Sequence, residues 1–130
     1  MQTTSNKPNG QGLGRLFKAL RCTFQGLRAA IKEEAAFRQE LLLAIILFPL
    51  SFIIAKDMLH WAALMSVLLL VLIVELVNSA IEALTDRVST ELHVLSGRAK
   101  DMASAAVTLS LLIATIVWGV SIYQYAVVIL

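Results

Sequence analysis

Three long apolar segments dominate this chain of 130 residues and restrict it to the integral membrane proteins. Hydrophobic residues make up 58% of the sequence and charged residues only 15%, whereas a soluble domain carries about 25% charge. The aqueous part is too small for a separate soluble domain. The composition therefore predicts an all-α membrane protein with three transmembrane helices. We expect the spans near residues 36–55, 58–83 and 102–125.

The first apolar run, residues 41–55, measures only about 22 Å as a helix, which is less than the roughly 30 Å hydrocarbon core. Its helix should therefore start earlier and bring the polar residues 38–40 into the interface, with a kink at Pro49. The polar stretch of residues 85–101 is expected to form a loop or helix–turn that breaks at Gly97.

The N-terminal region has a different character. Residues 1–12 are rich in turn-forming residues and predict a mobile tail. From Leu13 onward apolar residues recur at steps of three and four, with basic residues among them, as in an amphipathic helix on a membrane surface. We expect this surface helix at residues 13–32, interrupted at Gly26, and we expect residues 13–130 to form a single domain.

Basic residues are distributed unevenly about the spans. Seven Lys/Arg precede or open the first span and three lie between the second and third, but only Lys56 lies between the first and second. The positive-inside rule then predicts that the N-terminus and the second loop are cytoplasmic, and that the first loop and the C-terminus are outside. Because three helices bury little surface, we expect an oligomer, in which the small residues 103–106 would permit close helix packing.

The segment "IVELVNSAIEALTDRVSTE" (73–91) places polar side chains on one helix face, at steps of three and four. These side chains are Glu75, Asn78, Ser79, Glu82 and Asp86. An ionisable residue at membrane depth is by default a functional hypothesis. A carboxyl group removed from water, such as that of Glu75, suits proton transfer.

Other polar residues are expected at the same membrane face: Glu34 before the first span, and Lys100 and Asp101 before the third. Carboxylates without a Cys or His cluster suit Mg²⁺, which proteins bind through one or two carboxylates plus substrate phosphates. Carboxylates, Mg²⁺, a lysine and a partly buried base are the components of phosphoryl transfer, here to a lipid hydroxyl. We expect Cys22 to be a partly buried thiol and His60 to be solvated.

Two other classes of protein would use the same residues. In a small proton-coupled transporter Glu75 would carry the proton, although transport sites are expected nearer the bilayer midplane. In a non-catalytic scaffold Asn78 and Ser79 would only hold helices together, and the cytoplasmic cluster of charged residues would be left unexplained.

Three blocks of the sequence closely resemble the bacterial integral-membrane diacylglycerol kinase family. They are "EAAFRQE" (34–40), "VELVNSAIEALTDR" (74–87) and "ELHVLSGRAKDMASAAV" (91–107). The family motif reads Glu, two residues, Asn-Ser/Thr-Ala/Ser, an aliphatic residue, Glu, and then Asp four residues on. Residues 75–86 match it, except that Thr85 stands where the family usually has an aliphatic residue. The resemblance covers residues 13 to about 123.

This resemblance implies a homotrimer in the bacterial inner membrane, with active sites between subunits. It also implies phosphorylation of diacylglycerol by MgATP, giving phosphatidate and ADP. The implied partners are ATP and membrane lipids, with no nucleic acid. A relative that phosphorylates undecaprenol would share the fold and the carboxylates, although "EAAFRQE" favours the diacylglycerol branch.

The resemblance also implies roles for single residues. Glu75 would be the catalytic base, Glu34 and Glu82 would hold Mg²⁺, and Asn78 would position the γ-phosphate or the base. The implied nucleotide-binding residues are Arg15, Cys22, Glu34, Asn78, Glu82, Glu91, Leu92, His93, Lys100 and Asp101. The implied lipid-binding residues are Arg15, Arg28, Ala36, Phe37, Arg38, Gln39, Glu40, Trp61, Glu75 and Ser104.

Overall fold

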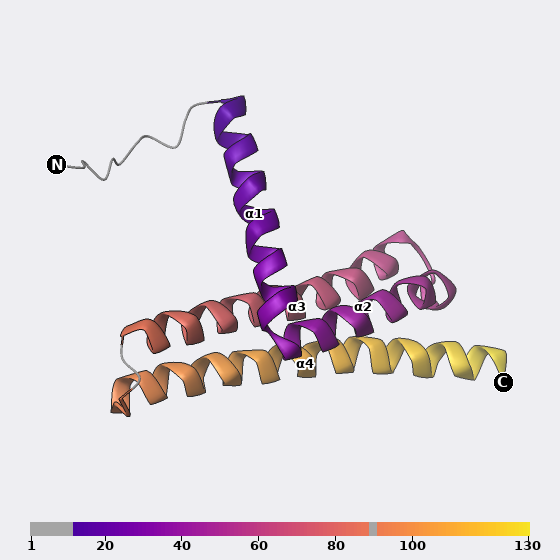
Figure 1. The fold of residues 1–130 in the computed structure, drawn as a ribbon. Helices are drawn as coiled ribbons and strands as arrows, with labels where there is room; N and C mark the ends of the chain where they lie inside the picture. Colours follow the sequence, from indigo (N-terminus) through magenta and orange to yellow (C-terminus); the bar gives the residue numbers. More distant parts are fainter. Residues whose placement is uncertain (1–11, 89–90) are drawn as a thin grey trace. The chain divides into compact units, whose positions relative to one another are not determined.

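The computed structural model describes residues 12–88 and 91–130, and every regular element within these ranges is an α-helix (Figure 1). The helices are α1 (Leu13–Glu33), α2 (Ala35–Ile54), α3 (Met58–Val88) and α4 (Val94–Ile129). The last three are long and apolar enough to cross a membrane. The predicted all-α fold with three membrane spans is therefore confirmed. The expected tail, apart from Gly12, lies outside the described residues.

The chain divides into two compact units, residues 1–34 and 35–130, and α1 is the helix of the first unit. Gly12 precedes α1 with φ of +65°, a backbone conformation that glycine adopts without strain. Gly26 lies inside α1 and does not interrupt it, contrary to the sequence expectation, because one glycine costs a helix interior only about 1 kcal/mol.

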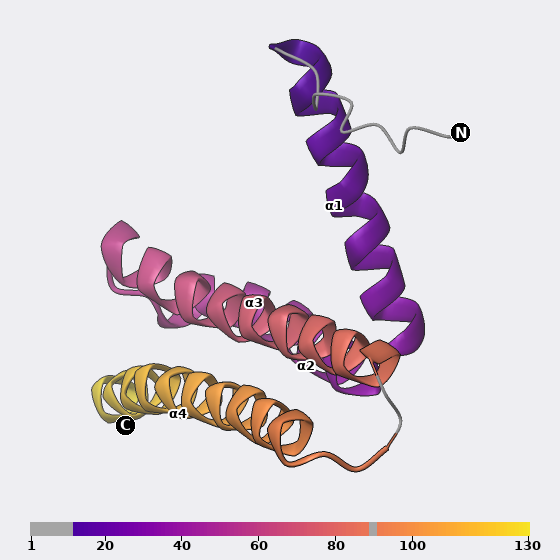
Figure 2. The ribbon, with the colours of Figure 1, turned by 90° about the vertical axis from the view of Figure 1, so that its left-hand side faces the viewer.

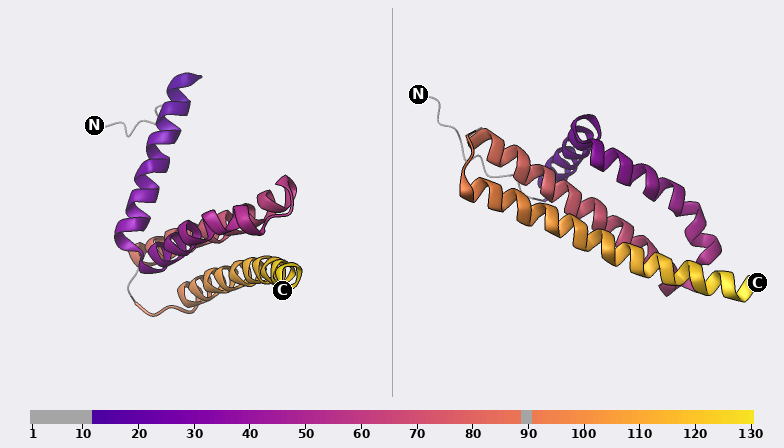
Figure 3. Two further views of the ribbon diagram at one scale, coloured as in Figure 1. Left: turned by 90° about the vertical axis from the view of Figure 1, so that its right-hand side faces the viewer. Right: turned by 90° about the horizontal axis from the view of Figure 1, so that it is seen from below.

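In the second unit α3 packs mainly against α4 and, over a smaller region, against α2. Figures 2 and 3 show α3 and α4 running alongside each other in opposite directions. The buried core comprises Ile54, Leu64, Leu68 and Trp118. It brings all three apolar helices together in the part of the bundle nearer the α2–α3 connection.

Polar side chains bind the helices together beside this core. The indole N–H of Trp118 donates to the carbonyl oxygen of Leu64 at 3.1 Å, which joins α4 to α3. The indole N–H of Trp61 donates to the hydroxyl of Ser51 at 2.9 Å, which joins α3 to α2. Interhelical hydrogen bonds of this kind contribute about 0.6 kcal/mol each in a membrane bundle, so they add to the packing of the core.

The helix bounds agree with the sequence expectation for α2, to within one residue, but differ around the α3–α4 connection. Helix α3 continues to Val88 instead of ending at residue 83, and α4 runs from Val94 to Ile129 instead of residues 102–125. Gly97 lies inside α4 and is not a break. The reason is that a helix longer than about 20 residues projects from the hydrocarbon core into water, where helical turns made of polar residues remain stable.

Two further expectations were wrong. His60 is not a solvated loop residue: it lies in the first turn of α3, half-buried, with its Nε2 2.8 Å from the hydroxyl oxygen of Ser121 on α4. Cys22 is exposed and not partly buried, because it lies in the part of α1 whose side chains are all exposed.

The fully buried Leu64 should be the most sensitive position of the core. We expect Leu64→Ala to lower the free energy of unfolding by about 2–5 kcal/mol because it leaves a cavity, and Leu64→Met to cost less than about 1.5 kcal/mol because it keeps the volume. Thermal unfolding of both variants in detergent micelles, followed by circular dichroism, measures the difference. Equal midpoints for the two variants would contradict the assigned core.

Candidate active site

The polar face of α3 passes from a buried end to an exposed end. Glu75 and Asn78 are only 4% and 8% exposed, Ser79 and Glu82 are half-buried, and Asp86 is exposed. The distance from Glu75 to Asp86 along the helix axis is about 16 Å at 1.5 Å per residue. Carboxyl groups are therefore distributed along one face of a single helix, from the apolar interior to water.

Small side chains on α4 allow the two helices to approach each other along this stretch. Ala103 and Ser110 are both buried, and small residues at helix interfaces let backbones come close together in membrane proteins. Residues 104–106 are exposed in the single chain, so their close packing in an oligomer stays a prediction.

Two oxygen atoms on the polar face of α3 are buried without a hydrogen-bond partner among the described residues. They are Oδ1 of Asn78 and Oγ of Ser79. A buried polar atom without a partner costs about 1–3 kcal/mol, so water or a ligand that supplied the missing bond would stabilise the site.

The oxygen donors of this face fit Mg²⁺ that arrives with a nucleotide. Within residues 12–88 and 91–130 no three His, Cys, Asp or Glu side chains form a group that could hold a metal by themselves. Mg²⁺ does not need such a cage, because it usually binds through one or two carboxylates, water and substrate phosphates. Glu82, half-buried near the exposed end of the face, could supply one such carboxylate.

A second carboxyl group lies near Glu75. Glu40 on α2 is half-buried, interacts electrostatically with Glu75, and has one oxygen, Oε2, without a hydrogen-bond partner in the described part of the chain. Glu40 also lines a cavity of about 150 Å³ whose other walls are largely apolar. The remaining lining residues are Leu43, Ala44, Leu47, Leu68, Val71, Leu111, Ala114, Thr115 and Trp118. Carboxyl groups beside an apolar wall suit an apolar molecule that carries a hydroxyl group.

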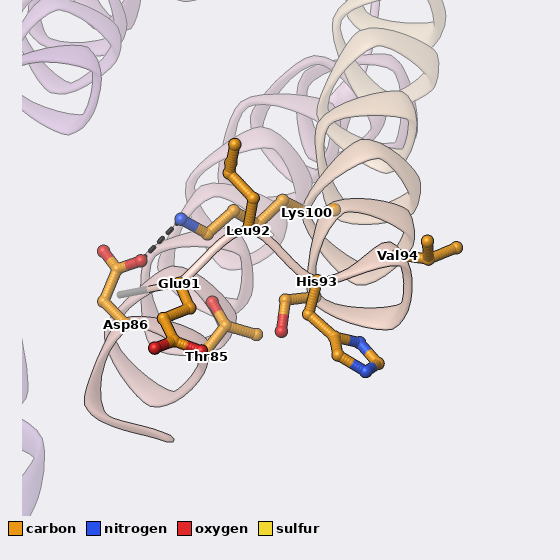
Figure 4. Close-up of a pocket in the computed structure, with 9 residues that line it drawn as sticks. Thr85, Asp86, Glu91, Leu92, His93, Val94 and Lys100 are labelled. Carbon is orange, nitrogen blue, oxygen red and sulfur yellow. Dashed lines mark hydrogen bonds and ion pairs between the residues drawn. The ribbon is translucent and has the colours of Figure 1, made fainter. Parts of the chain in front are cut away.

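A larger hollow, of about 280 Å³, lies between the end of α3 and the start of α4 (Figure 4). Its lining residues are Thr85, Asp86, Glu91, Leu92, His93, Val94, Ser96, Gly97 and Lys100. Nδ1 of His93 accepts a hydrogen bond from the backbone N–H of Leu95 at 3.1 Å and so caps α4. The structure thus brings four of the implied nucleotide-binding residues to one hollow: Glu91, Leu92, His93 and Lys100.

One ion pair crosses this hollow. Nζ of Lys100 on α4 donates to Oδ1 of Asp86 on α3 at 2.5 Å, and Figure 4 shows the two side chains pointing toward each other. The spacing of polar residues placed Asp86 on the functional face of α3 without giving it a role of its own, whereas Thr85 and Ser96 were not expected at the site. Continuing the helical spacing three residues beyond Glu82 would have drawn attention to Thr85.

Asp101, Ser104 and Trp61 are among the expected site residues that line neither of these cavities. Asp101 lies on a different face of α4 from Lys100 and lines a separate open hollow with Arg98. Ser104 is exposed on α4. Trp61 lies at the opposite end of α3, about 21 Å from Glu75 along the helix axis.

The expected residues of the first unit have to be considered separately. Arg15 and Cys22 line a hollow of about 250 Å³ on α1, together with Lys18 and Ala19. Glu34 is the C-cap of α1 and is half-buried. Since α1 belongs to the other unit, a pairing of Glu34 with Glu82 stays a prediction.

The other expected lipid-binding residues are mostly exposed. Arg28 is exposed on α1. In the first turns of α2 Phe37 is only 2% exposed, whereas Ala36, Arg38 and Gln39 are exposed. Their contact with a lipid stays a prediction as well.

Comparison with known proteins gives a consistent result. Residues 21–122 match the family described as prokaryotic diacylglycerol kinase. The chain is 47% identical over 108 residues to the diacylglycerol kinase of Haemophilus influenzae, an alignment that covers 83% of this chain and 92% of that protein. It is 43% identical over 117 residues to the diacylglycerol kinase of Escherichia coli K12, covering 90% and 96% of the two chains. A relative of the same name from Helicobacter pylori is 46% identical over 112 residues, which is 86% of this chain and 88% of that protein.

Proposed function

This chain belongs to the prokaryotic diacylglycerol kinase family, and we propose that it transfers the γ-phosphate of ATP to the primary hydroxyl of 1,2-diacylglycerol, giving phosphatidate and ADP. The observation that carries the proposal is the polar face of α3, which keeps the family motif and leads from the buried Glu75 to the half-buried Glu82. A kinase with one substrate in the membrane and the other in water needs such a passage between the two.

Glu75 is the proposed catalytic base, which accepts the proton of the lipid hydroxyl. Its low exposure keeps water away from the reacting oxygen, and this limits hydrolysis of ATP as a side reaction. Glu40 and the apolar cavity that it lines are the proposed site of the diacylglycerol glycerol group and the start of its acyl chains. Support for this placement is that Glu40 lines the cavity and that its carboxyl group lies close enough to Glu75 to interact with it electrostatically.

The nucleotide is proposed to lie in the hollow between α3 and α4. Lys100 contacts a phosphate group, residues 91–93 contact the rest of the nucleotide, and Asp101 supports it. Asn78 positions the γ-phosphate or the base. Mg²⁺, when bound with ATP, neutralises negative charge on the phosphates, and Glu34 and Glu82 are its proposed carboxylate ligands.

The proposed setting is the bacterial inner membrane, with the N-terminus and active site in the cytoplasm and the C-terminus outside. The uneven distribution of Lys and Arg supports this orientation. We propose a homotrimer with active sites between subunits. In support, Lys100 and Asp101, which are both expected to bind the nucleotide, line different hollows in the single chain.

A lipid-kinase assay tests the proposed reaction. Protein purified in mixed micelles and supplied with MgATP labelled at the γ-phosphate should transfer label to diacylglycerol, because the apolar cavity is lined by Glu40, whose carboxyl group interacts with that of the proposed base Glu75. Parallel reactions with undecaprenol, and without any lipid acceptor, are the controls. Label in undecaprenyl phosphate alone would replace the proposed substrate, and no label in either lipid would refute the kinase reaction.

Substitutions of Glu75 and of Glu82 should impair the reaction in different ways. Glu75→Gln should lower kcat at least about 100-fold, since a general base contributes about 10²–10⁴-fold, and should leave MgATP binding nearly unchanged. Glu82→Gln should chiefly weaken MgATP binding and change the dependence of activity on Mg²⁺.

Steady-state kinetics with separate titrations of MgATP and free Mg²⁺ distinguish the two variants. Near-normal kcat in Glu75→Gln would remove Glu75 as the base. An unaltered Mg²⁺ and ATP dependence in Glu82→Gln would remove that residue from the metal site.

A further inference from the structure

Asp86 lies in the last turn of α3, and its carboxylate accepts a hydrogen bond from Lys100 across the hollow. We propose that Asp86 is a positioning residue. It holds the ammonium group of Lys100 at the hollow, so that Lys100 is already oriented when a nucleotide phosphate binds. This inference rests on the proposed function, because it assigns Lys100 a phosphate ligand.

The ion pair contributes little as a structural connection between helices. The side chains of Lys100 and Asp86 are 41% and 61% exposed, and exposed ion pairs add little to folding stability because water and salt screen them. Helices α3 and α4 already pack together through a buried core and through the Trp118 hydrogen bond.

The position of Asp86 is unfavourable for its own helix. A carboxylate in the last turn of a helix lies near the negative end of the helix dipole, where a cation is preferred. Arg87 in the same turn meets that preference, whereas Asp86 does not. The stability of α3 therefore does not explain a carboxylate at this position, whereas the contact with Lys100 does.

The geometry of the ammonium group allows both contacts at the same time. Lysine has three N–H donors, and the bond to Asp86 uses one of them. Two donors remain for phosphate oxygens, so a nucleotide need not displace Asp86. Because a free lysine side chain loses rotamer freedom on binding, a lysine that is already held binds phosphate with a smaller entropic cost.

A double-mutant cycle on nucleotide affinity tests the inference. The probe is the Mg²⁺ complex of β,γ-methylene-ATP, which binds without phosphoryl transfer, titrated by calorimetry into protein in micelles without diacylglycerol. Asp86→Ala should raise the dissociation constant about five-fold in the wild-type background. In the Lys100→Ala background the same substitution should change it less than about two-fold, since neighbouring residues that act through one contact are not additive.

Two further variants complete the design. Asp86→Glu keeps the carboxylate and should retain near wild-type affinity. If Lys100→Ala alone removes measurable binding, the cycle cannot be completed, and the comparison of Asp86→Glu with Asp86→Ala then tests the inference. Arg87→Ala removes an exposed charge from the next residue, which does not line the hollow, and should change the affinity less than about two-fold. The KM for MgATP in the lipid-kinase assay should follow the dissociation constant.

Three results would overturn the inference. The first is an equal effect of Asp86→Ala in both backgrounds, which would show that Asp86 does not act through Lys100. The second is tighter nucleotide binding after Asp86→Ala, as expected if its negative charge merely repelled phosphate. The third is an affinity of Asp86→Glu as low as that of Asp86→Ala. Label transfer to diacylglycerol by the wild-type protein tests the proposed function independently, because it does not depend on Asp86.

Discussion

The cost of removing a carboxyl group from water is the constraint on which this structure depends. A buried charge is expensive unless it is paired or neutralised, and Glu75 is nevertheless almost fully buried among apolar helices. The same polar face continues outward along α3 to the half-buried Glu82 and the exposed Asp86. Because α3 continues beyond the length that a bilayer requires, the buried and exposed ends of the face belong to one rigid helix.

The two proposed substrates follow from the two ends of this face. Beside the buried end lies the cavity with Glu40 and apolar walls, which suits the hydroxyl group of a lipid. Beside the exposed end lies the hollow lined by Lys100, whose ammonium group can bind a phosphate. Phosphoryl transfer is catalysed mainly by positioning and electrostatics, so a helix that fixes the distance between these two sites contributes directly to the reaction. The proposed transfer of phosphate from ATP to a lipid needs one substrate at each end of the face.

The sequence predicted the bounds of α2 and the polar face of α3, but it did not predict where α3 ends and α4 begins or which side chains meet between helices. The bounds of α2 were correct to one residue because the length of an apolar run can be compared with the thickness of a bilayer. The face of α3 was predictable from residue spacing alone. The polar helical turns at the end of α3 and the start of α4 were mistaken for a loop. Polar residues indicate that a segment is exposed to water, but they do not indicate that it is not helical. The contacts of Glu40 with Glu75 and of Lys100 with Asp86 depend on how helices pack, which spacing within one helix does not reveal.

The most direct test of this account is the depth of α3 in a bilayer. Spin labels can be attached to single cysteines introduced, in a Cys22→Ser background, at the exposed positions Ile73, Val77, Leu84 and Val88. The account predicts that labels at residues 73 and 77 are relaxed mainly by oxygen dissolved in the lipid, and labels at 84 and 88 mainly by a water-soluble nickel chelate. The change between the two should then fall between residues 77 and 84. Preferential relaxation by oxygen at all four positions, or by the chelate at all four, would contradict a passage from lipid to water along this face.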